Sequence, residues 1–379
     1  MTARRSLSAL PTPAALVDIE IAERNIQRMA DRATKLGVRL RPHVKTHKCV
    51  EAARLQASAG TQAITVSTLA EARFFASAGF RDITYAVPLA PGRADEAAQL
   101  AARVDRLHVL IDHPDALQPV ERAARSHGRR LSVFLKVDCG YHRAGVDPES
   151  DGALQLAARI ASSAHVEFQG VLTHAGHSYA CRNPDEIRAV AAQERDVTAG
   201  FARRLRAAGI QVLDVSVGST PTMSVADHLE GVTEMRPGNY VFYDAFQSLI
   251  GSCALADTAL TVIATVVGRY PERSAFVIDA GALALSKDPG ARQVDPDTGY
   301  GIVQSLDRAV TWHHARIHAL SQEHGHVRVD GGLPTGTFRI GDKVRIIPNH
   351  SCLTAALFDR YYAIADSAVE AEWTPVRGW

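Results

Sequence analysis

Eight short apolar runs, rich in β-branched residues, constrain the fold of this chain most strongly, because they alternate with stretches of helical period. The runs begin near Arg39, Ala63, Asp82, Arg106, Leu131, Glu167, Val212 and Glu234. Amphipathic helices are predicted between most of them, for example over residues 69–78 and 184–208, whereas the connection after Thr220 is short and weakly helical. This alternation of strand and helix predicts an α/β fold with a parallel sheet.

The number of predicted strands decides how the sheet is arranged. Eight strands within about 210 residues fit a closed (β/α)8 barrel of the TIM type. A doubly wound open sheet is the alternative, but no G-x-G-x-x-G pattern follows the first strand, so the dinucleotide-binding fingerprint is missing. We therefore predict a (β/α)8 barrel over residues 18–255.

The sequence changes in character after Cys253, where helical periodicity largely disappears. Residues 259–285 predict adjacent strands broken by a turn at 270–273, and residues 342–348 predict a further strand. The run Asp330-Gly331-Gly332 predicts a hairpin between them. We predict a second, C-terminal β-rich domain over residues 256–379, to which residues 1–17 add a strand.

Composition and charge limit the class of protein. The 379 residues are 46% hydrophobic and 22% charged, and the formal net charge of +1 creates no global field toward nucleic acid or a membrane. Residues 1–11 lack the apolar segment of a signal peptide, and no apolar run has the length needed to cross a bilayer. The five cysteines include no C-x-x-C pair, which favours free thiols. We expect a cytoplasmic enzyme of small metabolites, with no nucleic-acid or membrane partner.

Lys45 is the first candidate for chemistry, because the carboxyl ends of the strands form the active face of a (β/α)8 barrel. The chain has only six lysines, and Lys45 follows the first strand between His43 and His47. Burial and cationic neighbours lower a lysine pKa, as a Schiff-base nucleophile requires. A surface lysine at the start of a loop explains the position equally well. Lys136, in the fifth strand, is a rival that also suits a buried ion pair.

Polar groups follow two further predicted strands. A glycine-containing loop after the fifth strand carries Arg143, which could meet an acceptor at the mouth of the barrel or form a salt bridge within its loop. His174, His177 and Tyr179 come directly after the sixth strand. Together these side chains indicate a lined pocket.

The seventh and eighth strands end in small residues. Gly218, Ser219 and Thr220 follow the seventh strand, and Gly238 and Asn239 follow the eighth. Loops in these two places build the phosphate site in many (β/α)8 barrels. Backbone N–H groups and hydroxyls there can bind phosphate oxygens.

A metal pair is suggested in the C-terminal domain. His350 and Cys352 would lie on one side of an extended segment, because side chains alternate with period two. Imidazole and thiolate suit zinc better than manganese or magnesium. A core cysteine beside a hydrogen-bonded histidine is the alternative. Nearby histidines supply candidate third ligands at His313, His314, His318, His324 and His326.

Several longer motifs resemble the D-serine dehydratase / D-threonine aldolase family. These motifs are Thr12-Pro13-Ala14, residues 41–48, residues 218–221, residues 236–244, Asp279-Ala280-Gly281, residues 322–325, residues 348–352 and Arg377-Gly378-Trp379. The resemblance covers nearly the whole chain. It implies a fold-type III pyridoxal-phosphate enzyme with an alanine-racemase-like barrel, working as a homodimer.

The resemblance also implies roles for individual residues. It implies that Lys45 carries the cofactor, and that His350 and Cys352 bind the divalent metal. Cofactor contacts are implied for His43, Arg143, His174, Tyr179, Gly218, Ser219, Thr220, Gly238 and Asn239. Arg143 is similar in setting to the residue that faces the pyridine nitrogen.

The metal pair favours one reaction within the family. Aldolase relatives often carry His-x-Asp, whereas dehydratase relatives carry the His-x-Cys found here, which favours zinc. We therefore expect a lyase for D-β-hydroxy-α-amino acids, and first D-serine dehydratase, which yields pyruvate and ammonia. The alternatives are D-threonine aldolase and a 3-hydroxy-D-aspartate dehydratase or aldolase, the dehydratase needing an extra cation for the second carboxylate. A non-catalytic cofactor carrier would lack the C-terminal domain, and an amino-acid racemase would need no metal.

Overall fold

The computed structural model describes residues 5–366 and 368–379, and these form two compact units. One unit comprises residues 28–238 and 376–379, and the other comprises residues 5–27, 239–366 and 368–375. The division falls within helix α1 (Ile19–Lys35). We describe each unit by itself. None of the described helices combines the length and the apolar character that crossing a membrane requires.

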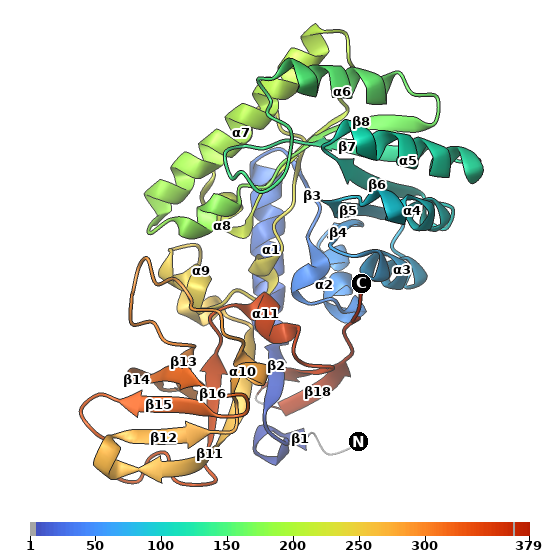
Figure 1. The fold of residues 1–379 in the computed structure, drawn as a ribbon. Helices are drawn as coiled ribbons and strands as arrows, with labels where there is room; N and C mark the ends of the chain where they lie inside the picture. Colours follow the sequence, from blue (N-terminus) through green and yellow to red (C-terminus); the bar gives the residue numbers. More distant parts are fainter. Residues whose placement is uncertain (1–4, 367) are drawn as a thin grey trace. The chain divides into compact units, whose positions relative to one another are not determined.

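The first unit is built on eight parallel strands, which confirms the predicted barrel (Figure 1). In chain order they are β3 (Arg39–Leu40), β4 (Ala63–Val66), β5 (Asp82–Pro88), β6 (Arg106–Ile111), β7 (Leu131–Lys136), β8 (Val166–Leu172), β9 (Asp214–Val217) and β10 (Glu234–Met235). From β4 to β10, strands that are consecutive in the chain also pair with each other in the sheet, and β10 then pairs with β3. All eight lie where the apolar runs predicted them.

The sheet is nearly closed. The two strands at its ends, β3 and β4, meet through a parallel bridge between His43 and Thr65. The Thr65 N–H donates to Pro42 O at 2.8 Å across the same seam. His43, whose bridge to Thr65 joins the two end strands, is therefore two positions before Lys45.

Helices connect the strands, as expected for parallel pairing. They are α2 (Val50–Ser58), α3 (Leu69–Ser77), α4 (Ala94–Ala101), α5 (Pro114–Ser126), α6 (Asp151–Ala161), α7 (Pro184–Ala207) and α8 (Thr220–Val225). Side-chain caps explain where several begin: Thr68 accepts from Glu71 N at 3.0 Å, and Asn183 accepts from Glu186 N at 2.9 Å. Such caps satisfy N–H groups that have no partner within the helix.

The second unit holds a ten-stranded sheet in which six strands, β11 to β16, close into a barrel, because β11 pairs with both β12 and β16. Its strands are β1 (Arg5–Ser6), β2 (Ala14–Asp18), β11 (Leu260–Tyr270), β12 (Ala275–Ile278), β13 (Ile302–Ser305), β14 (Thr311–Leu320), β15 (Gly325–Val329), β16 (Lys343–Ile347), β17 (Tyr361–Ala365) and β18 (Ala368–Trp373). Its short helices are α9 (Ala245–Leu249), α10 (Ala282–Leu285) and α11 (Ser351–Ala355). Strand β2 pairs with β11 and β17, so the predicted N-terminal addition is confirmed.

The predicted hairpin at Asp330-Gly331-Gly332 is wrong. These residues end β15, but β15 pairs with β12 and β14, while the next strand, β16, pairs with β11 and β13. The hairpin in this region is instead the tight turn between β14 and β15, where Ser321 N donates to His324 O at 2.9 Å. A glycine-rich turn marks the end of a strand without specifying that strand's partner.

Gly170 tests the close packing of the first barrel. It lies in β8 with φ +145°, and a Cβ at this position would meet the Asp214 carbonyl oxygen of β9 at 2.0 Å. We expect Gly170→Ala to destabilise the unit by about 3 kcal/mol, because backbone strain and overpacking act together. Thermal unfolding of the variant would show a clearly lower midpoint.

Gly152→Ala is the matched control, because Gly152 lies in α6 and only Ser150 Oγ, at 4.0 Å, approaches the added Cβ. Its midpoint should stay unchanged or rise slightly, since alanine is favoured over glycine in a helix by roughly 0.5–1 kcal/mol. Equal midpoints for Gly170→Ala and Gly152→Ala would contradict the close approach of β8 to β9.

Candidate active site

The segment after β3 presents Lys45. A short 3-10 helix, η2 (Val44–Thr46), follows His43, and the Lys45 N–H donates to His43 Nδ1 at 3.4 Å. The Lys45 side chain is exposed, whereas His47 is buried with Nδ1 3.0 Å from Cys49 O and Nε2 3.2 Å from Gln56 Oε1. His47 thus supports the fold beneath the loop, and His43 is the histidine that contacts the Lys45 segment directly.

The pKa of His174, which follows β8, reflects the positive charge at this end of the barrel. Its pKa is lowered well below the usual value, first by burial and then by repulsion from Lys45, Arg143, Lys136 and Arg236. Four cationic side chains from the ends of three strands, β3, β7 and β10, therefore lie near one imidazole. An anion would relieve this repulsion.

Neighbouring cations lower the pKa of His43 as well. Burial lowers its pKa most, and Lys45, Arg236 and His174 lower it further. The structure thus brings His43, Lys45, Arg143 and His174 together at the carboxyl ends of the strands, as their positions in the sequence predicted.

Lys136 is the last residue of β7 and is 5% exposed. Burial, followed by Arg236 and Arg143, lowers its pKa to about 8. No carboxylate among residues 5–366 and 368–379 forms an ion pair with it, so the alternative of a buried ion pair does not hold within the described residues.

The loop after β7 holds Arg143 without neutralising it. Asp138 fixes the loop by accepting from Gly140 N at 2.9 Å and from His142 N at 3.0 Å. The Arg143 guanidinium lies over the Tyr141 ring, 5.2 Å from its centroid, and the side chain is exposed. Within the described part of the chain no carboxylate pairs with Arg143, so the alternative of a loop salt bridge is not observed.

Arg236, directly after β10, is a residue that the sequence analysis did not single out. It is 4% exposed, and its Nε donates to Ser216 Oγ at 2.7 Å while Nη2 donates to Thr173 O. Burial lowers its pKa to about 10. An arginine next to the predicted glycine loop after the eighth strand was the signal that could have identified it.

The loop after β9 is shaped by glycine. Gly218 has φ +114° and lies against Met223 and the Arg236 backbone, so this position favours glycine over residues with a side chain. Ser219 caps α8, and its hydroxyl lies 2.9 Å from Ser178 Oγ. Thr220, the first residue of α8, is buried, and Tyr179 lies half-buried in the short 3-10 helix η4 (Gly176–Ala180).

Gly238 allows close approach to the lysine segment. A Cβ at Gly238 would meet His43 O at 2.7 Å, so only glycine lets the chain after β10 pass this near to the residue before η2. The loop after β10 therefore packs directly against the segment after β3 that carries Lys45.

Glu194, in α7, joins two of these loops and was also missed by the sequence analysis. Its fully buried carboxylate accepts from Ala175 N at 2.9 Å and Gly218 N at 3.0 Å through Oε1, and from Thr222 Oγ1 at 3.0 Å through Oε2. These contacts fix the loops after β8 and β9 from behind. A glutamate in a long amphipathic helix carries no sequence signal for such a role.

Asn239 belongs to the second unit and contacts the predicted metal pair. Its Nδ2 donates to Asp244 Oδ2 at 2.7 Å and Ser351 Oγ at 2.9 Å, and lies 3.6 Å from Cys352 Sγ. The side-chain donors of Asn239 are thus engaged within this unit. A phosphate contact at Asn239 would have to use its backbone N–H.

The predicted metal pair lies at the start of α11. His350 caps this helix, and Cys352 is its second residue. The His350 Nδ1–H lies 2.9 Å from Asp288 Oδ2, and a second side-chain hydrogen bond joins His350 to Cys352. Although burial opposes the charged imidazole, the contacts with Asp288 and Cys352 raise the His350 pKa well above its usual value.

A carboxylate behind a ligand histidine is typical of metal sites, because it fixes the ring and leaves the other nitrogen for the metal. Asp288 is 62 residues from His350, so sequence spacing gave no indication of it. Asp244 supports the same helix by accepting from Ser351 N at 2.9 Å, and burial raises its pKa.

The five other histidines of this region are not part of the pair. His313, His314 and His318 lie on β14, His326 on β15 and His324 in the turn between them, with the His318 and His326 rings 6.3 Å apart. Within residues 5–366 and 368–379, no three His, Cys, Asp or Glu side chains gather in a geometry that could hold a metal ion. His350 and Cys352 therefore offer two protein ligands, and a metal would complete its coordination with solvent or substrate.

The residues present fit both groups that the resemblance implies. Four cations around two histidines of lowered pKa suit the phosphate and carboxylate charges of a bound cofactor and substrate. An imidazole and a thiol, hydrogen-bonded to each other and backed by a carboxylate, suit a divalent metal of borderline softness.

Comparison with known proteins defines the class. Residues 17–245 match the family model of the alanine racemase N-terminal domain, and residues 259–364 match a serine dehydratase domain. The chain is 40% identical to a D-serine dehydratase from Dictyostelium discoideum, over 98% of each chain. It is 42% identical to a D-threo-3-hydroxyaspartate dehydratase from Delftia sp. (strain HT23), over 99% of each chain.

Solved structures agree with this assignment. The Delftia enzyme matches with a TM-score of 0.94 at 40% identity, covering 99% of this chain and 100% of that chain. Another structure of that enzyme, a cysteine-to-alanine variant, is described as its metal-free form. The chain belongs to the family of pyridoxal-phosphate-dependent lyases that includes the D-serine dehydratases and D-threonine aldolases.

Glu194→Gln tests how the loops around the cofactor site are held. The substitution leaves one oxygen where two accepted hydrogen bonds, so we expect pyridoxal phosphate to bind roughly tenfold more weakly, since a hydrogen bond to a buried charge contributes about 1.5–3 kcal/mol. Cofactor titration of the apoenzyme, followed by absorbance, measures the change. Asp196→Asn, at an exposed position of the same helix, is the control. Equal affinity in both variants would refute the role of Glu194.

Proposed function

We propose that this protein is a pyridoxal-phosphate- and divalent-metal-dependent D-serine dehydratase, which converts D-serine to pyruvate and ammonia. The observation that carries the proposal is the His350–Cys352 pair, hydrogen-bonded together with Asp288 behind the histidine. A thiol in this pair favours zinc over manganese or magnesium. The similarity to the Dictyostelium D-serine dehydratase supports the same assignment.

We assign the cofactor to Lys45, which is exposed after the first strand of the barrel. His43, Arg143, His174 and Tyr179 would contact the cofactor, and its phosphate would bind at Gly218, Ser219, Thr220, Gly238 and the Asn239 backbone. When bound, pyridoxal phosphate supplies an electron sink for the charge that develops at the substrate Cα. The cationic side chains near His174 hold the anionic groups of cofactor and substrate.

Lys45 has a second role in this proposal. When its side chain is not bound to the cofactor, Lys45 would offer its amine as a general base for the α-proton of the substrate. His350 and Cys352 would hold the metal, which would supply a Lewis acid for the departing β-hydroxyl.

A second candidate is 3-hydroxy-D-aspartate dehydratase, because the chain is 42% identical to the Delftia enzyme. That substrate carries a second carboxylate and needs an additional cation. Arg143 is exposed and has no carboxylate partner within the described residues, so for this second candidate it would bind the extra carboxylate in place of its contact with the cofactor.

We also propose a cytoplasmic homodimer. All five cysteines are free thiols, which is usual in a reducing compartment.

A product assay on the purified holoenzyme with added zinc tests the proposed function. We expect pyruvate and ammonia from D-serine, with the α-proton lost and no L-serine formed. Oxaloacetate and ammonia from 3-hydroxy-D-aspartate, with little pyruvate from D-serine, would establish the second candidate instead. Glycine and acetaldehyde from D-threonine as the main reaction would reject both dehydratases.

Two substitutions separate the cofactor from the metal. Lys45→Ala should abolish the absorbance of lysine-bound cofactor and reduce activity by at least about 10³-fold, because both its covalent and its basic roles are lost. Cys352→Ala should leave that absorbance unchanged while the bound metal, measured by elemental analysis, falls together with activity. Retention of stoichiometric zinc by Cys352→Ala would disprove the assignment of Cys352 as a ligand.

A further inference from the structure

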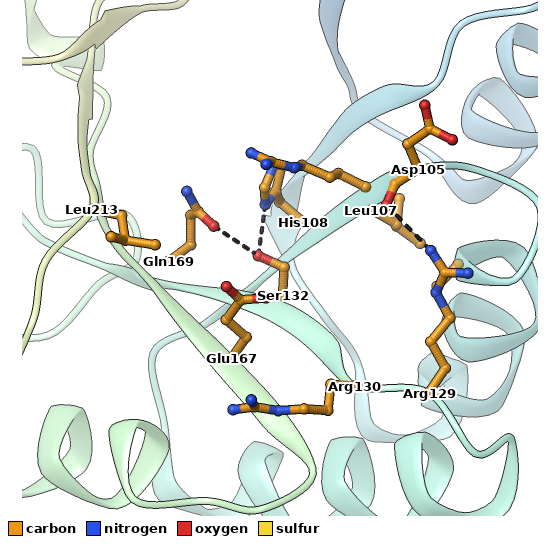
Figure 2. Close-up of a pocket in the computed structure, with 11 residues that line it drawn as sticks. Asp105, Leu107, His108, Arg129, Arg130, Ser132, Glu167, Gln169 and Leu213 are labelled. Atoms are coloured by element: carbon orange, nitrogen blue, oxygen red, sulfur yellow. Dashed lines mark hydrogen bonds between the residues drawn. The ribbon is translucent and has the colours of Figure 1, made fainter.

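A second cavity lies at the opposite end of the (β/α)8 barrel from Lys45. Its volume is about 230 Å³, and it is lined by the first residues of β6, β7 and β8 and by the residue before β9. Figure 2 shows His108, Ser132 and Gln169 pointing toward one another, with Arg129, Arg130 and Glu167 around them. Neither the proposed reaction nor the family comparison uses these residues.

The floor of this cavity, which we call the lower pocket, is a fixed polar surface. His108 is 1% exposed, and its Nδ1 lies 2.7 Å from Ser132 Oγ, which donates to Gln169 Oε1 at 3.3 Å. The Gln169 amide donates onward to Asp214, and His108 Nε2 lies 3.3 Å from Asp82 Oδ1. Because these groups are tied to one another, the floor has a defined shape before any ligand arrives.

The wall of the lower pocket carries uncompensated positive charge. Among the described residues, Arg129 donates to backbone carbonyls alone, at Val104 O (2.9 Å) and Asp105 O (3.2 Å). Arg130 likewise donates to Val166 O, with Nη2 at 2.5 Å. Arg106 is exposed and forms no side-chain hydrogen bond among the described residues.

The carboxylates of the lower pocket do not neutralise these arginines. Asp105 and Glu167 are exposed, and neither forms an ion pair within residues 5–366 and 368–379. Three guanidinium groups therefore face two carboxylates that remain in water. A guanidinium held by backbone carbonyls keeps its full charge and further N–H donors for an anion.

A purely structural role explains this arrangement poorly. Residues at the amino-terminal end of such barrels usually serve stability, and bulky apolar side chains usually fill the interior. Here the stabilising contacts are already complete in the floor, whereas the arginines of the wall contribute charge that no described carboxylate uses. The cavity is also too polar to be filled by an apolar ligand.

We propose that the lower pocket is a binding site for a small dianion, either a dicarboxylate or a phosphate, separate from the cofactor end of the barrel. Arg106, Arg129 and Arg130 provide the charge, and Ser132 and His108 form the polar floor. Glu167 opposes binding and keeps the site weak enough for reversible occupancy.

Isothermal titration of the cofactor-loaded enzyme tests this proposal with succinate and inorganic phosphate as separate probes. Succinamide serves as the neutral analogue, and ionic strength is held constant with sodium chloride. We expect saturable binding of at least one dianion and none of succinamide. The stronger of the two probes identifies the carboxylate or the phosphate as the natural chemistry.

Three variants with the same type of change locate the site. Arg106→Gln should weaken binding about fivefold, because the substitution removes a charge-assisted contact to the anion without disturbing any hydrogen bond of the fold. Glu167→Gln should strengthen binding by roughly threefold, because a like charge is removed. Arg122→Gln, on α5 and outside the lining of the pocket, should leave the affinity unchanged.

Two results would overturn the proposal. One is the absence of saturable binding for both dianions up to about 10 mM, because a site with millimolar affinity would be largely occupied at that concentration. The other is binding that responds identically to Arg106→Gln, Glu167→Gln and Arg122→Gln, since this would place the anion at another site or reduce it to ionic screening. Because none of these residues belongs to the proposed catalytic set, product formation from D-serine tests the proposed function independently.

Discussion

The buried ion pair between Arg41 and Glu234 is the interaction on which the barrel end around Lys45 depends. Arg41 Nε lies 2.7 Å from Glu234 Oε2, and the two side chains are 3% and 1% exposed. The other carboxylate oxygen accepts from Ser216 Oγ at 2.6 Å, and Ser216 accepts from Arg236. Breaking a buried ion pair costs up to about 3–5 kcal/mol, and here Arg41 also pairs with Asp82 at the start of β5, so the loss of Glu234 alone would leave it one partner. Strands β3, β9 and β10 are therefore fixed relative to one another by charge as well as by their backbone ladders.

The same pattern of buried acids behind functional groups occurs in both units. Glu194 holds the backbone of the loops after β8 and β9, and Asp244 holds the start of α11. Asp288 orients His350. In each case a carboxylate fixes a group of the proposed site from behind, so that the geometry does not depend on loop stiffness alone.

Sequence reasoning predicted the strands of the barrel well, because each is a short apolar run whose flanking residues differ sharply in character. It also placed Lys45, His174 and the glycine loop at Gly218 at the correct strand ends. The prediction was wrong at Asp330-Gly331-Gly332, where a turn-forming sequence was taken to indicate that the strands on either side of it pair with each other. Glu194 and Asp288 were missed because their contacts join positions far apart in the chain, and no local pattern distinguishes a supporting carboxylate from a solvated one. Arg236 was missed although its place beside the glycine loop after the eighth strand could have indicated it.

The seam between β3 and β4 has a consequence for the order in which the enzyme matures. The Lys45 segment is anchored on one side by Thr65 and on the other by β10, whose residues follow almost two hundred positions later. Contacts of such long range form late, since the closure of a large loop precedes them. During synthesis, the lysine leaves the ribosome early but gains its final surroundings only after Gly238 has emerged. Under the proposed assignment of Lys45, the cofactor site is therefore complete only after β10 has paired with β3.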